Sequence, residues 1–234
     1  MLGLEPVDRK STASIIADRL REAVMSGVLE PGTQLGEADL ARQLGVSRGP
    51  LREAMQRLVQ EGLLRSERHR GLFVIELDQA GIVDVYRVRR IVERAAGHLI
   101  LERDLGLVAD RLAEVHDEMR QAAAESDAQG MVEADLDFHE AFVEESGSIR
   151  LVRMSRTLLV ETRMCLSSLA ESYQFPHQAS DEHAMIVEAV RARDEQRLLH
   201  LVDAHIDDAL RRLTTAYAEQ SEETDDGAAP EPAR

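Results

Sequence analysis

Residues 36–74 carry the pattern that most constrains the fold of this chain. A short amphipathic helix is expected over about 37–44, and Gly45 ends it because glycine readily adopts the left-handed backbone conformation. A second helix is expected to begin after Ser47, a good N-cap, with Pro50 in its first turn, where a missing N–H has no intrahelical partner to lose. Two short strands follow, over 63–66 and 71–75, around a polar tip at 67–70. This order of elements predicts a winged helix-turn-helix.

The second helix divides into an apolar face and a cationic face. Its buried stripe is predicted to consist of Leu51, Met55, Leu58 and Val59. Arg48, Arg52 and Arg57 belong to the remaining surface, and the first two lie in the N-terminal half of the helix. That half reaches base edges when such a helix enters a major groove. The helix is therefore typical of a DNA-binding regulator.

The net charge of the whole chain is opposite to that expected for DNA binding, but the charge is unevenly distributed along the sequence. The formal net charge is −16 and the isoelectric point is about 4.9, whereas a domain that grips phosphates is expected to be basic. Residues 1–75 hold 11 basic and 10 acidic side chains, and residues 47–70 hold six Arg against three Glu. The excess acid therefore belongs to the rest of the chain.

Length and composition favour two modest domains in a reducing compartment. A chain of 234 residues can bury two separate cores. No apolar run approaches the ~20 residues needed to span a bilayer, and the N-terminus lacks a secretory signal pattern, so we expect a cytoplasmic protein that does not enter a membrane. The single cysteine, Cys165, excludes an intramolecular disulfide and is expected to be a small core residue on a helix.

The remainder of the chain is expected to be entirely helical. An amphipathic helix over 11–26 precedes the helix-turn-helix, and Gly27, Pro31 and Gly32 break it. From Ala80 onward the periodicity predicts six helices, over roughly 80–103, 105–125, 127–146, 148–172, 178–192 and 194–218. The predicted fold is mostly α, with an N-terminal winged helix-turn-helix and a C-terminal antiparallel all-α bundle. The predicted domains are residues 8–76 and 80–218, followed by a disordered acidic tail at 219–234.

Four side chains in the bundle form a pattern typical of a metal site. Asp135 and His139 are four residues apart on one predicted helix, so they share a face. His183 and His205 lie on two later helices among apolar neighbours and are expected to face the interior. Three imidazoles and a carboxylate suit a divalent transition metal such as Zn, Ni, Co or Mn. The chain has eight His, any of which can be an ordinary core or surface residue, and Asp137 is an alternative to Asp135.

The N-terminal half resembles the DNA-binding domain of the GntR family of bacterial transcription factors. The similarity is carried by SGVLEPGTQLGEADLARQLGVSRGPLREAMQRLVQEGLL and by RGLFV. The rest resembles the FCD ligand-binding domain of the FadR subfamily, on VYRVRRIVERAAGHLILER, on DLDFHEAFVEESG and on the helices of His183 and His205. Six rather than seven bundle helices indicate the VanR-like branch of that subfamily.

The resemblance implies roles for individual residues. Asp135, His139, His183 and His205 match the Asp and three His that hold a metal in many FCD domains, where a small carboxylate effector completes the coordination. Arg89 resembles the Arg that reaches into the effector pocket, and its alternative is a surface ion pair with Glu93.

Three positions depart from the family pattern. Gly49 stands where many relatives have Thr, Ser148 where Asn is usual, and Ala38 where close fatty-acid-responsive relatives often have Arg. One side-chain contact to DNA is therefore expected to be replaced by a backbone N–H, the turn at Ser148 is expected to differ from the family's usual turn, and the operator is expected to differ from that of those relatives.

The expected protein is a homodimeric, ligand-responsive repressor that reads a pseudo-palindromic operator in double-stranded DNA and is released by a small organic acid. DNA contacts are expected from Ser47, Arg48, Gly49 and Arg52 on the recognition helix and from Arg70 and Gly71 in the wing. A metal-dependent, hydrolase-like enzyme is one alternative, because such a ligand set can activate water. A protein-interaction module is another, which the Arg excess at 47–70 disfavours.

Overall fold

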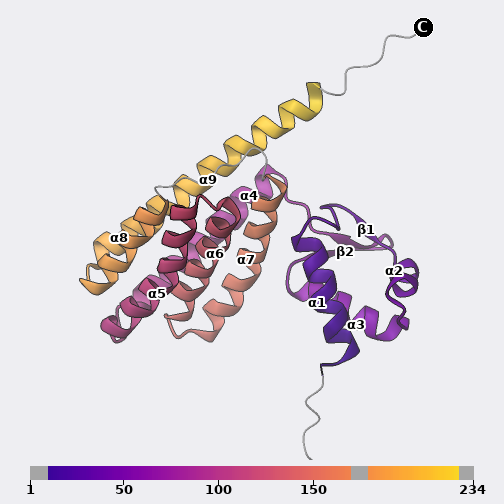
Figure 1. Cartoon of the computed structure of the whole chain (residues 1–234), viewed down its shortest axis with the longest axis horizontal. Helices are drawn as coiled ribbons and strands as arrows, with labels where there is room; N and C mark the ends of the chain where they lie inside the picture. Colours follow the sequence, from indigo (N-terminus) through magenta and orange to yellow (C-terminus); the bar gives the residue numbers. More distant parts are fainter. Residues whose placement is uncertain (1–9, 170–178, 227–234) are drawn as a thin grey trace, which may run out of the picture. The chain divides into compact units, whose positions relative to one another are not determined.

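The computed structural model describes residues 10–169 and 179–226, and the chain divides into two compact units between Glu76 and Leu77 (Figure 1). Each unit is built around its own core. Because the break falls at the expected linker, every element predicted for the helix-turn-helix lies in the first unit and every bundle helix lies in the second.

The first unit is a winged helix-turn-helix, as predicted. Its helices are α1 (Thr12–Met25), α2 (Glu37–Leu44) and α3 (Arg48–Gln60), and its strands are β1 (Gln34–Leu35), β2 (Leu64–Glu67) and β3 (Gly71–Val74). The strands form an antiparallel sheet in the order β1-β3-β2, with Ser66 opposite Leu72 in the hairpin. The two-residue strand β1 was not predicted, because two residues are too few to show an alternating pattern.

Local sequence signals set the helix boundaries in this unit. Gly45 follows α2 with φ +66°, the left-handed conformation that glycine adopts without strain. Leu51, Met55 and Leu58 of α3 are fully buried, and α3 packs against α1. Two details differ from the expectation: Val59 is only half-buried, and Arg57 turns toward α1, where its Nη1 donates to Ser14 Oγ at 2.9 Å.

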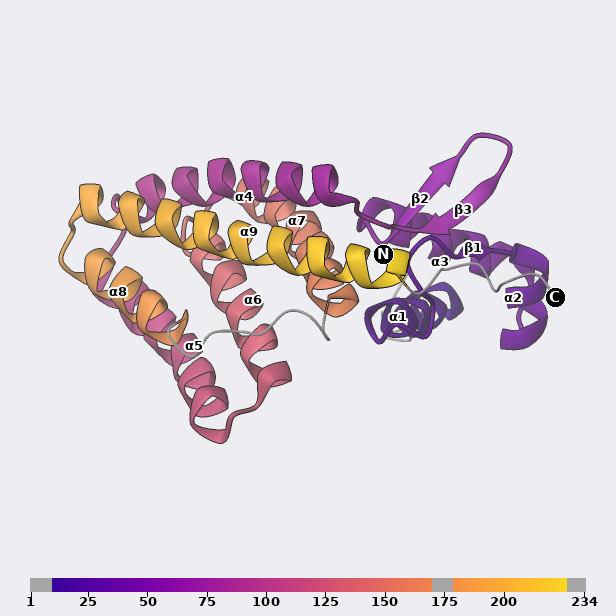
Figure 2. The same ribbon diagram turned by 90° about the horizontal axis from the view of Figure 1, so that it is seen from above.

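The second unit is an antiparallel bundle of six helices within the described residues (Figure 2). They are α4 (Gln79–Ile100), α5 (Leu105–Glu125), α6 (Ala128–Glu144), α7 (Ile149–Ser168), α8 (Ala179–Arg191) and α9 (Glu195–Asp226). All six begin within two residues of their predicted starts. The predicted break at 173–177 lies outside the described residues.

The predicted end of the last helix was wrong. The α9 helix continues through Asp226, so residues 219–226 are helical rather than a disordered tail, and 227–234 lie outside the described part of the chain. Leu213 and Ala216 on its C-terminal half are buried against the start of α4 and the end of α7, and this packing supports the helix beyond Ala218. Acidic residues alone suggested solvation, but the contacts of the preceding turns favour helix propagation.

Capping side chains define the turns that bring the bundle helices together. Asp78, Asp104 and Asp127 each accept a hydrogen bond from a backbone N–H in the first turn of the helix that follows. Ser148 does the same for α7, with its Oγ 3.4 Å from Leu151 N. The serine that departs from the family pattern therefore still caps its helix.

The α6 helix lies in the middle of the bundle, where its side chains are surrounded by those of several other helices. The α6 helix contacts α4, α5 and α7, while α9 packs against both α4 and α8. Phe138 and Phe142 of α6 are among the largest fully buried side chains of the protein. No helix in the described part of the chain is long and apolar enough to cross a bilayer.

Cys165 lies in the core between α7, α4 and α9, as expected for a small apolar residue. Burial, with a smaller contribution from the nearby Glu161 carboxylate, raises the pKa of its thiol to about 12. Because only the thiolate is nucleophilic, the native protein should react with Ellman's reagent at about pH 8 at least ~10-fold more slowly than the guanidinium-unfolded protein. Equal rates in the two states would show that the thiol is accessible.

Candidate metal centre and DNA-reading surface

The four predicted metal ligands converge at one point inside the bundle. Asp135 and His139 lie one turn apart on α6, while His183 comes from α8 and His205 from α9. Their exposed fractions are 6%, 2%, 0% and 5%, so none of them is a surface residue. The helical spacing on α6 places two ligands on one face, and the packing of α8 and α9 supplies the other two.

The distances within the cluster match the dimensions of a metal coordination sphere. One ligand atom from each residue lies within 4.8 Å of all the others. The Oδ1 atom of Asp135 is 3.3 Å from His183 Nε2 and 3.9 Å from the Nε2 atoms of both His139 and His205. Ligand atoms about 2.0–2.2 Å from a shared zinc ion stand ~3–4 Å from one another. The separations therefore fit a single ion.

Two acidic side chains bind the outer nitrogens of the cluster. Glu93 of α4 lies with Oε2 2.8 Å from His139 Nδ1, and Glu182 of α8 lies with Oε2 2.8 Å from His205 Nδ1. Burial by itself would raise the pKa of Glu93, but the His139 and Arg89 side chains outweigh burial and lower that pKa to about 2. The hydrogen bond from His205 lowers the pKa of Glu182 against a smaller opposing effect of burial.

The chemistry of the cluster fits a cation better than it fits a self-contained polar network. Asp135 Oδ1 is buried and has no hydrogen-bond partner among the described residues, which is costly for a carboxylate oxygen. In addition, His139 Nε2 and His205 Nε2 stand only 3.0 Å apart. Three imidazole nitrogens and one carboxylate oxygen are the donor set that divalent zinc, nickel, cobalt and manganese accept. The residues present therefore fit a metal of this class.

Arg89, predicted either to line an effector pocket or to form a surface ion pair, is not at the surface. Its side chain is 3% exposed, and its Nε donates to Glu93 Oε1 at 3.1 Å. Its Nη1 donates to Thr162 Oγ1 at 3.4 Å, and the guanidinium lies 5.0 Å from the centre of the Tyr86 ring. The ion pair with Glu93 exists, but it is buried, so the surface-pair alternative was wrong.

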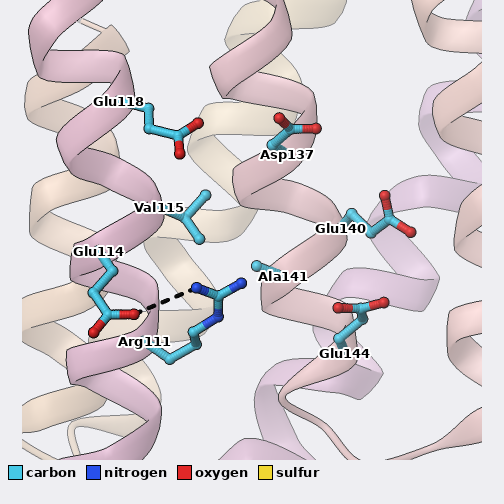
Figure 3. A pocket seen from close by; sticks show the side chains of 8 residues that line it. All are labelled: Arg111, Glu114, Val115, Glu118, Asp137, Glu140, Ala141 and Glu144. Atoms are coloured by element: carbon cyan, nitrogen blue, oxygen red, sulfur yellow. Dashed lines mark hydrogen bonds and ion pairs between the residues drawn. The ribbon is translucent and has the colours of Figure 1, made fainter.

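Asp137, the alternative to Asp135, points away from the histidines. It is exposed and lines a hollow of about 300 Å³ between α5 and α6, with Glu118, Glu140 and Arg111 (Figure 3). Partial burial raises the pKa of Asp137, and the neighbouring carboxylates of Glu118 and Glu140 raise it further. The two aspartates are two residues apart, so they cannot share a helix face.

The two outer carboxylates were missed as parts of the site. The sequence indicated Glu93 only as a partner of Arg89 and did not indicate Glu182. The signal for Glu93 was available, because buried residues of α4 recur at helical spacing through Arg89, Glu93 and Ala96. No comparable signal identified Glu182, which is half-buried and depends on how α8 lies against α9.

All the predicted DNA-contacting residues of the recognition helix are exposed. Ser47, Arg48, Gly49 and Arg52 lie at or near the start of α3 on the face opposite its core. Arg48 forms no ion pair within residues 10–169 and 179–226, whereas Arg52 Nε donates to Glu37 Oε2 of α2 at 2.6 Å. A Cβ added at Gly49 would meet nothing within 4 Å, so the surface is open there. Arg48 is directly available to a ligand, and Arg52 must exchange a partner.

The wing presents a second cationic surface. Arg68, His69 and Arg70 form its tip, and His69 adopts a left-handed conformation with φ +66°. Arg70 pairs with Glu67, and its guanidinium lies 5.0 Å from the centre of the Phe73 ring; the next residue, Gly71, is exposed. The predicted wing contacts are therefore accessible.

Comparison with known proteins identifies the family of each of the two units. The model of the gntR family of bacterial regulatory proteins matches residues 12–74, and the FCD domain model matches residues 84–208. The chain belongs to the GntR family of bacterial transcriptional regulators. It joins a GntR reading head to an FCD domain, as its sequence motifs predicted.

Relatives of this GntR regulator are similar over most of their length. The gluconate operon transcriptional repressor of Bacillus subtilis is 26% identical over 92% of this chain and 90% of its own, and the Nta operon transcriptional regulator of Aminobacter aminovorans is 30% identical over 75% and 82%. The crystal structure of a GntR regulator from Rhodococcus sp. RHA1 is 29% identical, covers 89% of this chain and 100% of its own, and has a TM-score of 0.74.

These relatives set the class of function for this GntR regulator. GntR proteins bind DNA and FCD domains bind small-molecule effectors, and some relatives are named repressors. Transcriptional regulators are not enzymes, so the hydrolase-like alternative is excluded.

Proposed function

We propose that this protein is a metal-containing, ligand-responsive repressor whose FCD domain senses a small carboxylate metabolite. The observation that carries the proposal is the convergence of Asp135, His139, His183 and His205, all buried, within the domain of an otherwise DNA-binding chain. A bound divalent metal would supply a Lewis-acidic centre to which an anionic oxygen binds. The four side chains would hold the ion, and the effector oxygen would complete its coordination.

Arg89 is proposed to bind the carboxylate effector. Its guanidinium is fully buried close to the cluster, and its Nη2 lies 3.0 Å from Glu93 Oε1 at an angle that makes no hydrogen bond with any described residue. A planar guanidinium with an N–H to spare is suited to a carboxylate. An acid held by both the metal and Arg89 would be selected for its charge and for the distance between its two anchoring groups.

The output is proposed to be operator binding by a homodimer. Two winged helices related by twofold symmetry read two half-sites of a pseudo-palindrome. The exposed Ser47, Arg48, Gly49 and Arg52 would contact base edges and phosphates from α3, and Arg70 and Gly71 would act from the wing. The effector regulates this step if it binds the DNA-free state of the dimer more tightly than the DNA-bound state.

The proposed function is tested with DNA from upstream of the protein's own gene. Fluorescence anisotropy should detect a specific complex of the zinc-loaded protein, and one member of a panel of small mono-, di- and hydroxycarboxylic acids should weaken it by about 5-fold or more. Arg89→Met should still bind the DNA but lose the response to the acid. Operator binding that no acid alters, in the presence or absence of zinc, would refute the sensing role.

A further inference from the structure

Glu93 and Glu182 determine which nitrogen of two histidines faces the centre of the cluster. An ionised carboxylate only accepts hydrogen bonds, so His139 Nδ1 and His205 Nδ1 must each carry the proton that they donate at 2.8 Å. A neutral imidazole carries one N–H, so the Nε2 atom of each ring then presents a lone pair toward Asp135 and His183.

Without these carboxylates the two rings have a competing arrangement. The Nε2 atoms of His139 and His205 are 3.0 Å apart, a distance at which one can donate a hydrogen bond to the other if it carries the proton. That tautomer satisfies the pair by itself, but it blocks one ligand atom with hydrogen. With both Nδ1 protons held by Glu93 and Glu182, the Nε2 lone pairs of the two neutral rings face each other, and a metal cation between them relieves the repulsion.

We propose that Glu93 and Glu182 are positioning residues of the metal centre, which hold His139 and His205 in the tautomer that binds a divalent metal. This rests on the proposed metal centre and adds two residues outside its ligand set. The two act from different helices: Glu93 reaches His139 from α4, and Glu182 reaches His205 from the turn of α8 that also carries His183. Carboxylates in this position raise the basicity of a ligating imidazole and fix its orientation.

Glu93 is expected to have the larger effect, because it is shared. Its side chain is 3% exposed against 28% for Glu182, so water cannot replace it. One oxygen, Oε2, binds His139, while the other, Oε1, accepts from Arg89 Nε at 3.1 Å. The carboxylate therefore joins the proposed effector-binding guanidinium to a metal ligand.

The test measures zinc affinity of the full-length protein by competition with a chelating dye. Glu93→Gln is nearly isosteric, but its amide can donate to His139 Nδ1 and so permits the blocked tautomer. We expect it to weaken zinc binding about 10–100-fold, and Glu182→Gln to weaken it by less. The Co²⁺-loaded protein gives a second readout, since the d–d absorption bands should shift in both variants because the ligand field of the imidazoles changes.

The matched control is Thr162→Val. Thr162 is fully buried and accepts from Arg89 in the same network, but it does not touch a histidine. Zinc affinity equal to that of the wild type in Thr162→Val, together with loss in Glu93→Gln, supports a positioning role. Equal losses in Thr162→Val and Glu93→Gln would instead indicate general loosening of the core and overturn it.

The remaining outcomes separate this inference from the function on which it rests. If the wild type binds zinc and both Gln variants bind it with the same affinity, the positioning role is overturned and the metal centre stands. A wild type that binds neither zinc nor cobalt overturns the metal centre itself. If Glu93→Gln does not fold, as judged by circular dichroism of the apo protein, Glu182→Gln at the half-buried position decides the question.

Discussion

Replacing both His183 and His205 with Ala is expected to abolish stoichiometric metal in the purified protein. The two residues supply half of the four protein ligands, from two separate helices. The remaining Asp135 and His139 lie on one face of α6 and cannot enclose an ion, so the affinity should fall below the level that survives purification. Elemental analysis of protein purified without added chelator measures the effect directly.

The control for this variant is another buried histidine of the same bundle. His116 is 6% exposed, and its Nε2 binds Ser180 across α5 and α8 at 2.8 Å from the carbonyl oxygen and 3.1 Å from Oγ. His116→Ala removes a buried imidazole of equal size and should retain the metal. Equal metal content in the wild type and in the double variant would show that the four residues are not the ligand set.

Replacing Arg52 with Ala is expected to weaken specific operator binding by about 1–3 kcal/mol, or roughly 5–150-fold, with a much smaller effect on random DNA. Arg52 lies on the exposed face of the recognition helix, where its guanidinium can pair with the O6 and N7 atoms of guanine. Its pair with Glu37 is exposed and is worth only about 0–1 kcal/mol, so the loss of that pair does not account for an effect of this size.

Arg42→Ala is the control for charge alone. Arg42 is a 78% exposed arginine of α2, so its removal changes the net charge equally. Arg42→Ala should lower the affinity for operator and random DNA to a similar degree and reduce the dependence of binding on salt. Arg52→Ala should instead lower the discrimination between operator and random DNA. Unchanged discrimination in Arg52→Ala would contradict its role in reading bases.

Most of the fold could be predicted because its boundaries depend on local chemistry. Gly45 ends α2 through its own backbone freedom, and Asp104, Asp127 and Ser148 cap the helices that they precede. The predictions of helix and strand boundaries were wrong where a boundary depends on contacts with residues far away in the sequence. The strand β1 exists only because Gln34 and Leu35 pair with β3, and α9 extends to Asp226 from a buried segment at Leu213 and Ala216.

The candidate site shows the same division. Spacing on one helix placed Asp135 with His139, apolar neighbours indicated that His183 and His205 face the interior, and family resemblance joined the four residues into one ligand set. No pattern could say whether Arg89 is buried. A surface pair with Glu93 and a buried one have the same four-residue spacing. The difference lies in the packing of α6, α7 and α9 around that face of α4.

By itself the sequence determined the two-domain organisation, the winged helix-turn-helix, the six-helix pattern of the bundle and three histidines that could bind a metal together with Asp135 or Asp137, because periodicity, capping and turn chemistry act within a few residues. Only the tertiary structure decided that Asp135 rather than Asp137 faces the three histidines, that Arg89 is buried, and that Glu93 and Glu182 hold two of the rings. Those facts depend on the angles and depths at which four helices pack, which no local interaction specifies.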